Sequence, residues 1–373
     1  MNTVYGSQEL CTNVIGKQLC IGCGACIDLC PYFRSYKGKT SMLFPCTLQE
    51  GRCFSYCPKI EVDLDKLSQR LFGHLYDGNP LGHYISVSMS RAGESVGSGQ
   101  FQAGGTVSAI MEYVLSRGYC DAVVVTDREK LLPIPRFVTQ PEEIRTCSSS
   151  KYTAAPTLSA FHGAMKEGFK QIGIVGTPCQ VLATAQIRSN PMDEKDFHDP
   201  TGLVVGLFCT WALDYRAFES YISTRIDKDG IEKIDIPPPP SEIMEIYMTG
   251  GDKVSIPLNE IRKLVPESCS YCIDMTSEFS DISVGVMEGR PEMNSLIVRT
   301  ERGRRIIEEA QRDGYLIISD MPQENLEHLI WAAGNKKERA LLKSTQENIV
   351  NTTQEDRLSY LRINRETLNQ YSV

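Results

Sequence analysis

The stretch Cys20-Ile-Gly-Cys23-Gly-Ala-Cys26-Ile-Asp-Leu-Cys30-Pro31 constrains this chain more than any other. Three cysteines recur at every third position, and a fourth follows four residues later, directly before a proline. We expect Gly22 and Gly24 to let a short loop curl so that three thiolates converge, while Pro31 turns the chain away. Four unrelated buried thiols or a disulfide knot would not require this spacing. The run therefore predicts ligands of an iron–sulfur cubane.

A second group of cysteines ends in Cys53-Phe-Ser-Tyr-Cys57-Pro58, which repeats the end of the first motif. This half-repeat resembles a bacterial two-cluster ferredoxin, in which the last cysteine of each motif serves the other cluster. The resemblance assigns two sets of ligands: Cys20, Cys23, Cys26 and Cys57 for one cluster, and Cys30, Cys46 and Cys53 for the other. Glu50 stands where a further cysteine would fall, so Cys11, Glu50 or solvent completes the second site, or it holds a three-iron cluster.

The cysteine content sets the chemical context. Fourteen cysteines in 373 residues, with neither a basic start nor an apolar core at the N-terminus, favour metal or redox chemistry in a reducing, cytoplasmic environment over disulfides. The net charge of −8 argues against a nucleic-acid partner. We expect no membrane span, because no run of about 18 apolar residues occurs. The length suits two or three domains.

A glycine-rich turn follows a charged exit at 59–66 and a connector at 67–90 that glycines and a proline interrupt. It runs from Gly97 to Thr106 into an amphipathic helix that Gly118 closes. Such a turn offers backbone N–H groups and a helix dipole to a phosphate, although an ordinary flexible turn has the same composition. No strand clearly precedes it, so it does not match the Rossmann fingerprint.

Short β-branched runs then alternate with helical segments. The pattern predicts strands at Ala122–Thr126, Ile172–Val175 and Leu203–Phe208, helices at 154–168, 180–188 and 211–225, a stiff segment at Pro237–Pro240, a hairpin over 243–256 and a mainly helical tail at 304–373. This alternation indicates an α/β core with a mostly parallel sheet covered on both faces. Ligands bind beyond the carboxyl ends of the strands in such sheets.

Four later cysteines bear on that edge. Cys179 and Cys209 each follow a predicted strand, and Cys269 and Cys272 form a C-x2-C pair. Four thiolates suit one more [4Fe–4S] cluster, and they equally suit tetrahedral zinc or a structural half-site. The ferredoxin-like module favours iron–sulfur. We assign Cys120 to the core and leave Cys147 without a role.

Several stretches in this order resemble the beta subunits of coenzyme F420-dependent hydrogenases and dehydrogenases. They are the cysteine-rich module, SGQFQAGGTVSAIMEYVL, SSKYTAAP, VGTPCQV, GLFC, CSYC and DISVG, and together they cover about residues 15 to 305. The resemblance implies a flavin–iron–sulfur oxidoreductase subunit that exchanges a hydride between F420 and FAD. Its electrons would pass through two or three [4Fe–4S] clusters to or from a partner complex of the hydrogenase, formate dehydrogenase or heterodisulfide reductase type.

The resemblance also assigns residues. Cys179, Cys209, Cys269 and Cys272 would bind the core cluster, and Thr177 and Pro178 would lie near the isoalloxazine. The remaining FAD contacts would be Gly97, Ser98, Gly99, Gly104, Gly105, Thr106, Ser150, Lys151, Tyr152, Gly176 and Ser283. The expected domains are a ferredoxin-like α+β domain at 1–66, the flavin- and F420-binding core at 67–303 and a helical extension at 304–373. NAD(P)H as the hydride carrier, or an electron-transfer adaptor without a hydride substrate, remain alternatives.

Overall fold

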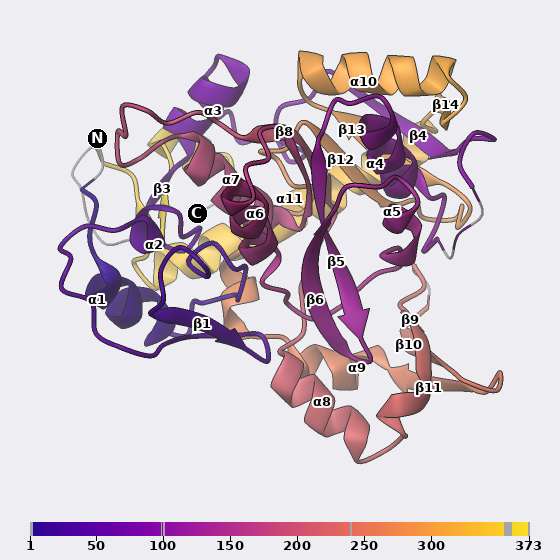
Figure 1. Cartoon of the computed structure of the whole chain (residues 1–373), viewed down its shortest axis with the longest axis horizontal. Coiled ribbons are helices and arrows are strands. Elements are labelled where there is room, and N and C mark those ends of the chain that lie inside the picture. Colours follow the sequence, from indigo (N-terminus) through magenta and orange to yellow (C-terminus); the bar gives the residue numbers. More distant parts are fainter. Residues whose placement is uncertain (1–2, 98, 100, 239–240, 354–359, 372–373) are drawn as a thin grey trace.

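An eight-stranded mixed sheet organises the structure, a computed structural model that describes residues 3–97, 99, 101–238, 241–353 and 360–371 (Figure 1). The strands follow the order β14-β4-β13-β12-β8-β7-β5-β6. Their bounds are β4 (Ser86–Ala92), β5 (Ala122–Glu129), β6 (Leu132–Val138), β7 (Ile172–Gly176), β8 (Thr201–Leu207), β12 (Ile282–Val286), β13 (Asn294–Val298) and β14 (Leu316–Asp320).

Only the centre of this sheet is parallel. β5, β7, β8 and β12 run parallel to one another, whereas β6, β13, β4 and β14 pair antiparallel with the strands beside them. The α/β class is confirmed, but the expectation of a mostly parallel sheet is wrong outside the centre. Short connections such as the one between β12 and β13 can join antiparallel strands only, because a parallel pair needs a longer crossover.

Helices cover both faces of the sheet. α4 (Thr106–Ser116) and α10 (Glu301–Arg312) share one buried cluster with Val123 and Val125 of β5. α6 (Thr157–Lys166) and α7 (Pro178–Arg188) share another cluster with Val124. Successive residues of a strand point to opposite faces, so the fully buried β-branched run of β5 serves both layers.

A smaller sheet lies beside the main one, at the lower right of Figure 1. β9 (Ile231–Asp235), β10 (Ile243–Met248) and β11 (Lys253–Pro257) pair antiparallel, which confirms the predicted hairpin. Its apolar face packs on α8 (Tyr215–Ser223). The predicted stiff segment Pro237–Pro240 lies partly outside the described residues. The remaining short elements are α5 (Glu143–Thr146), α9 (Leu258–Ile261) and the 3₁₀ turns Lys228–Gly230, Arg262–Leu264 and Glu267–Tyr271.

The segment 67–90 is more structured than a connector. α3 (Leu64–Phe72) begins at the Asp63 cap and ends at Gly73, whose φ is 82°. β4 then pairs with β13 and β14, so a strand does precede the glycine-rich turn. The sequence of β4, SVSMSRA, is rich in serine and only half-buried, and its two partner strands lie far along the chain. Its local pattern therefore did not identify it as a strand.

The N-terminal and C-terminal segments are built together. The first contains α1 (Ser7–Leu10), a π-helical turn (Cys11–Ile15), β1 (Phe33–Tyr36), β2 (Lys39–Met42), α2 (Arg52–Ser55) and β3 (Val62–Asp63), and the second contains α11 (Gln323–Gln346), β15 (Val350–Asn351), β16 (Leu361–Arg362) and α12 (Arg365–Asn369). β16 pairs parallel with both β3 and β15. One buried cluster joins Leu10 and Phe33 with Leu341 and Leu361. The tail at 304–373 thus holds strands as well as the predicted helices.

The described part of the chain contains no helix long and apolar enough to cross a membrane.

Candidate functional site

A cavity of about 480 Å³ lies where β7 and β8 end. Val175 and Thr177 line it at the end of β7, and Leu207 and Phe208 line it at the end of β8. The size and the position at the carboxyl ends of parallel strands suit a bound cofactor or substrate. The strand pattern of the sequence also predicts ligand binding at this edge of the sheet.

The turn from β7 into α7 presents three predicted site residues to this cavity. Thr177 caps α7 in a reciprocal arrangement with Gln180, whose Oε1 accepts from the Thr177 N–H at 2.8 Å. Pro178 occupies the first helical position, where its missing N–H leaves no bond unmade. Cys179 follows in the first turn, so its sulfur lies at the positive end of the helix dipole, which favours a thiolate. The Thr177 hydroxyl lies 3.2 Å from that sulfur.

The glycine-rich turn forms another wall. Gly105 precedes α4 with a φ of 79°, a left-handed conformation in which Phe101 leaves no room for a Cβ. Thr106 begins the helix; its N–H donates to Asn294 Oδ1 at 3.2 Å and its hydroxyl lies 2.9 Å from Ser90 Oγ. Both Gly105 and Thr106 line the cavity, so the N-terminus of α4 faces it. A helix start of this kind suits an anion such as a diphosphate.

Not every predicted flavin contact lies at this cavity. Those that line it are Gly105, Thr106, Ser150, Lys151, Tyr152, Thr177 and Pro178. Among the described residues, Gly97, Gly99, Gly104, Gly176 and Ser283 lie outside the lining, and Ser98 is outside the described residues. Gly97 packs on the Arg145 guanidinium. Ser283 is fully buried and its hydroxyl accepts from Arg299 Nε at 2.7 Å.

Lys151 lies at the cavity with its ammonium turned into its own loop. It donates to the carbonyls of Cys147, Ser148 and Ser149, the last at 2.9 Å. Burial lowers the pKa of Lys151 to about 8, because the cation is removed from water. An anion bound beside Lys151 would raise this pKa again by stabilising the charged ammonium group. The site therefore fits the negatively charged part of a cofactor. Cys147, to which no sequence pattern assigns a role, is a buried wall residue of the same loop.

The four later cysteines all line the large cavity. We call Cys179, Cys209, Cys269 and Cys272 the core quartet. Burial raises the pKa of Cys179 to about 11, and the thiols of Cys272 and Cys269 add to this effect. Burial likewise raises the pKa of Cys209, with contributions from the other three thiols. A metal group would have to displace these protons, and the thiols already lie close enough to interact with one another.

Four of the N-terminal cysteines, Cys20, Cys23, Cys26 and Cys57, line a second, smaller cavity. Cys53 interacts with Cys30 and Cys46 and also with Cys26, and burial is the main reason that its pKa rises to about 11. The division into two ligand sets stays a prediction. Gly24, with a φ of 89°, lets the loop curl as expected, and a Cβ there would lie 2.4 Å from the Pro156 carbonyl oxygen.

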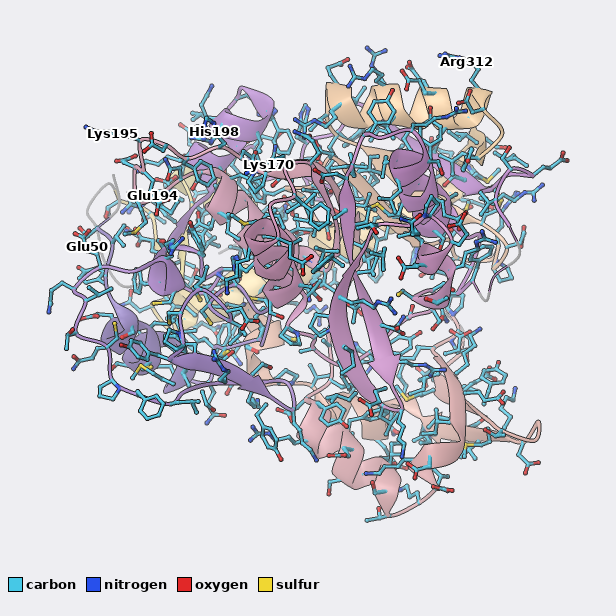
Figure 2. All side chains as sticks on the ribbon, viewed as in Figure 1. Glu50, Lys170, Glu194, Lys195, His198 and Arg312 are labelled. Atoms are coloured by element: carbon cyan, nitrogen blue, oxygen red, sulfur yellow. The ribbon has the colours of Figure 1, made fainter. Side chains whose placement is uncertain are left out.

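Neither Cys11 nor Glu50 is a clear fourth ligand for the incomplete second set of cysteines. Glu50 is exposed, and Figure 2 shows it at the outer edge of the N-terminal module. The Cys11 sulfur lies 3.9 Å from Met42 Sδ. Across the described chain, no three His, Cys, Asp or Glu side chains converge on a single metal ion, and none of the fourteen cysteines forms a disulfide. Cluster ligation by these thiols stays a prediction, which their grouping supports.

Three residues that the sequence did not single out also line the large cavity: Lys59, Lys336 and Tyr360. Lys59 lies in the segment interpreted as a charged exit, and its position directly after Cys57-Pro58 was the available signal. Lys336 and Tyr360 lie in the supposed tail, and no sequence signal marked them. Arg299, which follows β13, is buried and donates to the carbonyls of Leu81 and His83.

Comparison with known proteins gives matches to two family models. Residues 92–162 match the N-terminal part, and residues 169–324 the C terminus, of the coenzyme F420 hydrogenase/dehydrogenase beta subunit. The beta subunit of the coenzyme F420 hydrogenase of Methanococcus voltae is 31% identical over 242 residues, which are 64% of this chain and 85% of the relative. One subunit of the F420H2 dehydrogenase of Methanosarcina mazei is 28% identical over 319 residues, 84% of this chain and 88% of the relative.

A solved structure shares the fold. A chain of the F420-reducing [NiFe] hydrogenase complex from Methanosarcina barkeri superimposes with a TM-score of 0.65 at 23% identity, over 72% of this chain and 93% of that chain.

Proposed function

The chain belongs to the family of coenzyme F420 hydrogenase/dehydrogenase beta subunits, which are oxidoreductases, and from that premise we propose that it exchanges a hydride between coenzyme F420 and FAD. We further propose that it relays electrons through [4Fe–4S] clusters to or from other subunits of a redox complex. One observation carries this proposal. The start of α4, the Ser150–Tyr152 loop and the core quartet converge on one cavity, which joins a predicted flavin site to predicted cluster ligands.

The residues at the cavity suit these groups. Gly105 and Thr106 would hold a diphosphate at the N-terminus of α4, with Lys151 as a nearby cation. Thr177 and Pro178 directly precede Cys179, so a predicted flavin contact and a predicted cluster ligand share one turn. A bound flavin supplies the interconversion of two-electron and one-electron chemistry, and the protein supplies position and electrostatics.

The first test is the cofactor content of protein purified without oxygen. We expect FAD, acid-labile sulfide and about eleven or twelve iron atoms per chain, from four per cubane less any loss at the incomplete site. Replacing Cys269 and Cys272 by serine should remove about four of these iron atoms. Cys120→Ser, a buried thiol outside both cavities, is the matched control and should remove none. Zinc with little iron would overturn the proposal.

The second test identifies the hydride carrier. Bleaching of the flavin band near about 450 nm by F420H2 supports the proposed reaction. Bleaching by NADH or NADPH alone would replace F420 with a nicotinamide. If none of the three reduces the flavin, the chain is an electron-transfer adaptor and the proposed hydride exchange is wrong.

A further inference from the structure

Two lysine ammonium groups are buried beside the core quartet. Lys59 is 3% exposed and Lys336 is 7% exposed. Throughout the described residues, neither lies within 4.0 Å of a carboxylate oxygen. Lys337, the neighbour of Lys336 on α11, has such a partner, since its Nζ lies 2.8 Å from Glu278 Oε1. Among the described residues, the fold therefore pairs Lys337 directly and leaves Lys59 and Lys336 without a contacting carboxylate.

The contacts of the two ammonium groups are neutral oxygens. Lys59 donates to the Ser268 carbonyl at 3.2 Å and to the Tyr360 hydroxyl at 3.1 Å, and lies 4.2 Å from the centre of that ring. Lys336 donates to the carbonyls of Cys209 and Asp274, both at 2.7 Å. The Asp274 carboxylate accepts the Glu278 N–H at 2.9 Å and attracts Lys336 without contacting it. A buried cation without a contacting counter-charge is unfavourable, so an anionic group in the adjacent cavities would stabilise both ammonium groups.

Lys59 occupies the wall between the two cavities. Ile21, Pro58 and Lys59 line both the large cavity and the smaller one that contains Cys57. Lys336 lines only the large cavity. The two cavities are therefore neighbours, and Lys59 is a wall residue of both.

The hydrogen bonds tie each lysine to segments that carry the thiols. Lys59 follows Cys57 by two positions and donates to the carbonyl of Ser268, the residue before Cys269. Lys336 donates to the carbonyl of Cys209 itself. Lys59 therefore lies against segments of both sets of thiols, and Lys336 against a segment of the core quartet.

We propose that Lys59 is a fixed positive charge shared by two iron–sulfur clusters, one at the core quartet and one at Cys20, Cys23, Cys26 and Cys57, and that it raises the reduction potential of both. Lys336 has the same effect on the core cluster alone. This inference rests on the proposed function, because it requires clusters at both sets of thiols.

The physical reason is the charge of the electron. A reduced cluster carries one more negative charge than an oxidised one, and a nearby cation in a poorly solvated site stabilises it. When one electron leaves one cluster and enters the other, no bond or proton need change. The shared cation stabilises the electron on either side, so it raises both potentials and leaves their difference largely unchanged. Reducing equivalents come from the proposed donor, F420H2.

The test is an anaerobic redox titration of the whole protein, followed by the electron paramagnetic resonance signals of the individual clusters. Lys59→Met should lower the reduction equilibrium constants of two clusters at least tenfold, which corresponds to about 59 mV for one electron. Lys336→Met should do so for one of these two only. Lys59→Arg keeps the charge and should retain potentials near the original ones.

Lys166→Met is the control, because Lys166 also contacts the cysteine-rich loop, at the Asp28 carbonyl, but is exposed to solvent. Solvent and salt screen that charge, so no potential should move. If Lys59→Met binds less iron, Lys59→Gln is titrated by the same criteria. Unchanged potentials, or a change confined to one cluster, overturn the shared-charge inference but leave the proposed function standing. A wild-type protein without iron and sulfide overturns both.

Discussion

Replacing Lys337 should reveal how firmly α11 is held in the core. The side chains of Lys337 and Glu278 are 0% and 2% exposed, and their charged atoms lie 2.8 Å apart. Lys337 also donates to the Tyr76 hydroxyl at 2.7 Å, and Tyr76 donates to the other Glu278 oxygen at 2.8 Å. Removing one member of a buried pair leaves an uncompensated charge, which typically destabilises a protein by about 3–5 kcal/mol. We expect Lys337→Met to lose about 3 kcal/mol near pH 8.

The pH dependence of this loss follows from Glu278. Burial raises its pKa to about 7 from an ordinary value of 4.5, although Lys337 opposes the rise. Because the folded state holds the proton more tightly than the unfolded state, the contribution of Glu278 is favourable below about pH 4.5 and is lost as the pH rises towards 7. Without Lys337 the pKa of Glu278 rises further, so the loss continues above pH 7. The deficit of the variant should therefore be small near pH 5 and largest near pH 8.

The assay is anaerobic urea unfolding, followed by far-ultraviolet circular dichroism near pH 5 and pH 8. Glu278→Gln in the Lys337→Met background should recover about 2 kcal/mol near pH 8, because no unpaired charge remains. Lys343→Met is the control on the same helix. Its ion pair with Glu267 is partly exposed, and its loss should be about 1 kcal/mol or less. A deficit that is equal at both pH values, or no larger than the Lys343→Met deficit, would refute this reasoning.

Two further predictions concern the contact between the cysteine-rich loop and α6. Gly24→Ala places a Cβ 2.4 Å from the Pro156 carbonyl oxygen at a positive φ, so the purified variant should contain about four fewer iron atoms. Gly168→Ala is the control, because Gly168 has a φ of 94° but open space around it, and this variant should retain its iron. Equal iron contents in the two variants would contradict the expectation. His162 lies 3.0 Å from the Ala25 carbonyl oxygen, and burial lowers its pKa to about 4. The unfolded state therefore binds more protons, and about 3 kcal/mol of stability should be lost as the pH falls from about 6.5 to 4. His162→Gln should reduce this acid sensitivity in a pH titration of unfolding, and an unchanged profile would rule the residue out.

The centre of the fold could be predicted because its strands carry their own signal. β5, β7 and β8 each contain a continuous buried run, and β7 and β8 are each followed directly by a helix. That order also predicted that Cys179 and Cys209 would lie at one edge of the sheet. The outer strands gave no such signal. β4 and β14 are only partly buried, and each becomes a strand through partners that are distant in sequence.

The charges around the cavity could not be predicted for a related reason. Lys336 and Lys337 lie in a polar helix, where a sequence pattern suggests solvated residues. Burial of both follows from the packing of α11 against the 3₁₀ turn that carries Cys269 and against β15. The burial of Arg299 was not predictable either, because its acceptors, the carbonyls of Leu81 and His83 and the hydroxyls of Thr276 and Ser283, come from other segments of the chain. No local pattern marks a cation whose partners are brought together only by the fold.

The pairing of β3 with β16 has a consequence for how the protein is made. Lys59 and Tyr360, which meet beside the core quartet, are 301 positions apart, as are Glu61 and Arg362. During synthesis the cysteine-rich segment leaves the ribosome well before the strand that pairs with it. The large cavity therefore gains the wall that Tyr360 supplies only after the 301 positions that follow Lys59 have been translated. Assembly machinery that delivers iron and sulfide would meet either an unfinished site on a nascent chain or a finished one on a released protein.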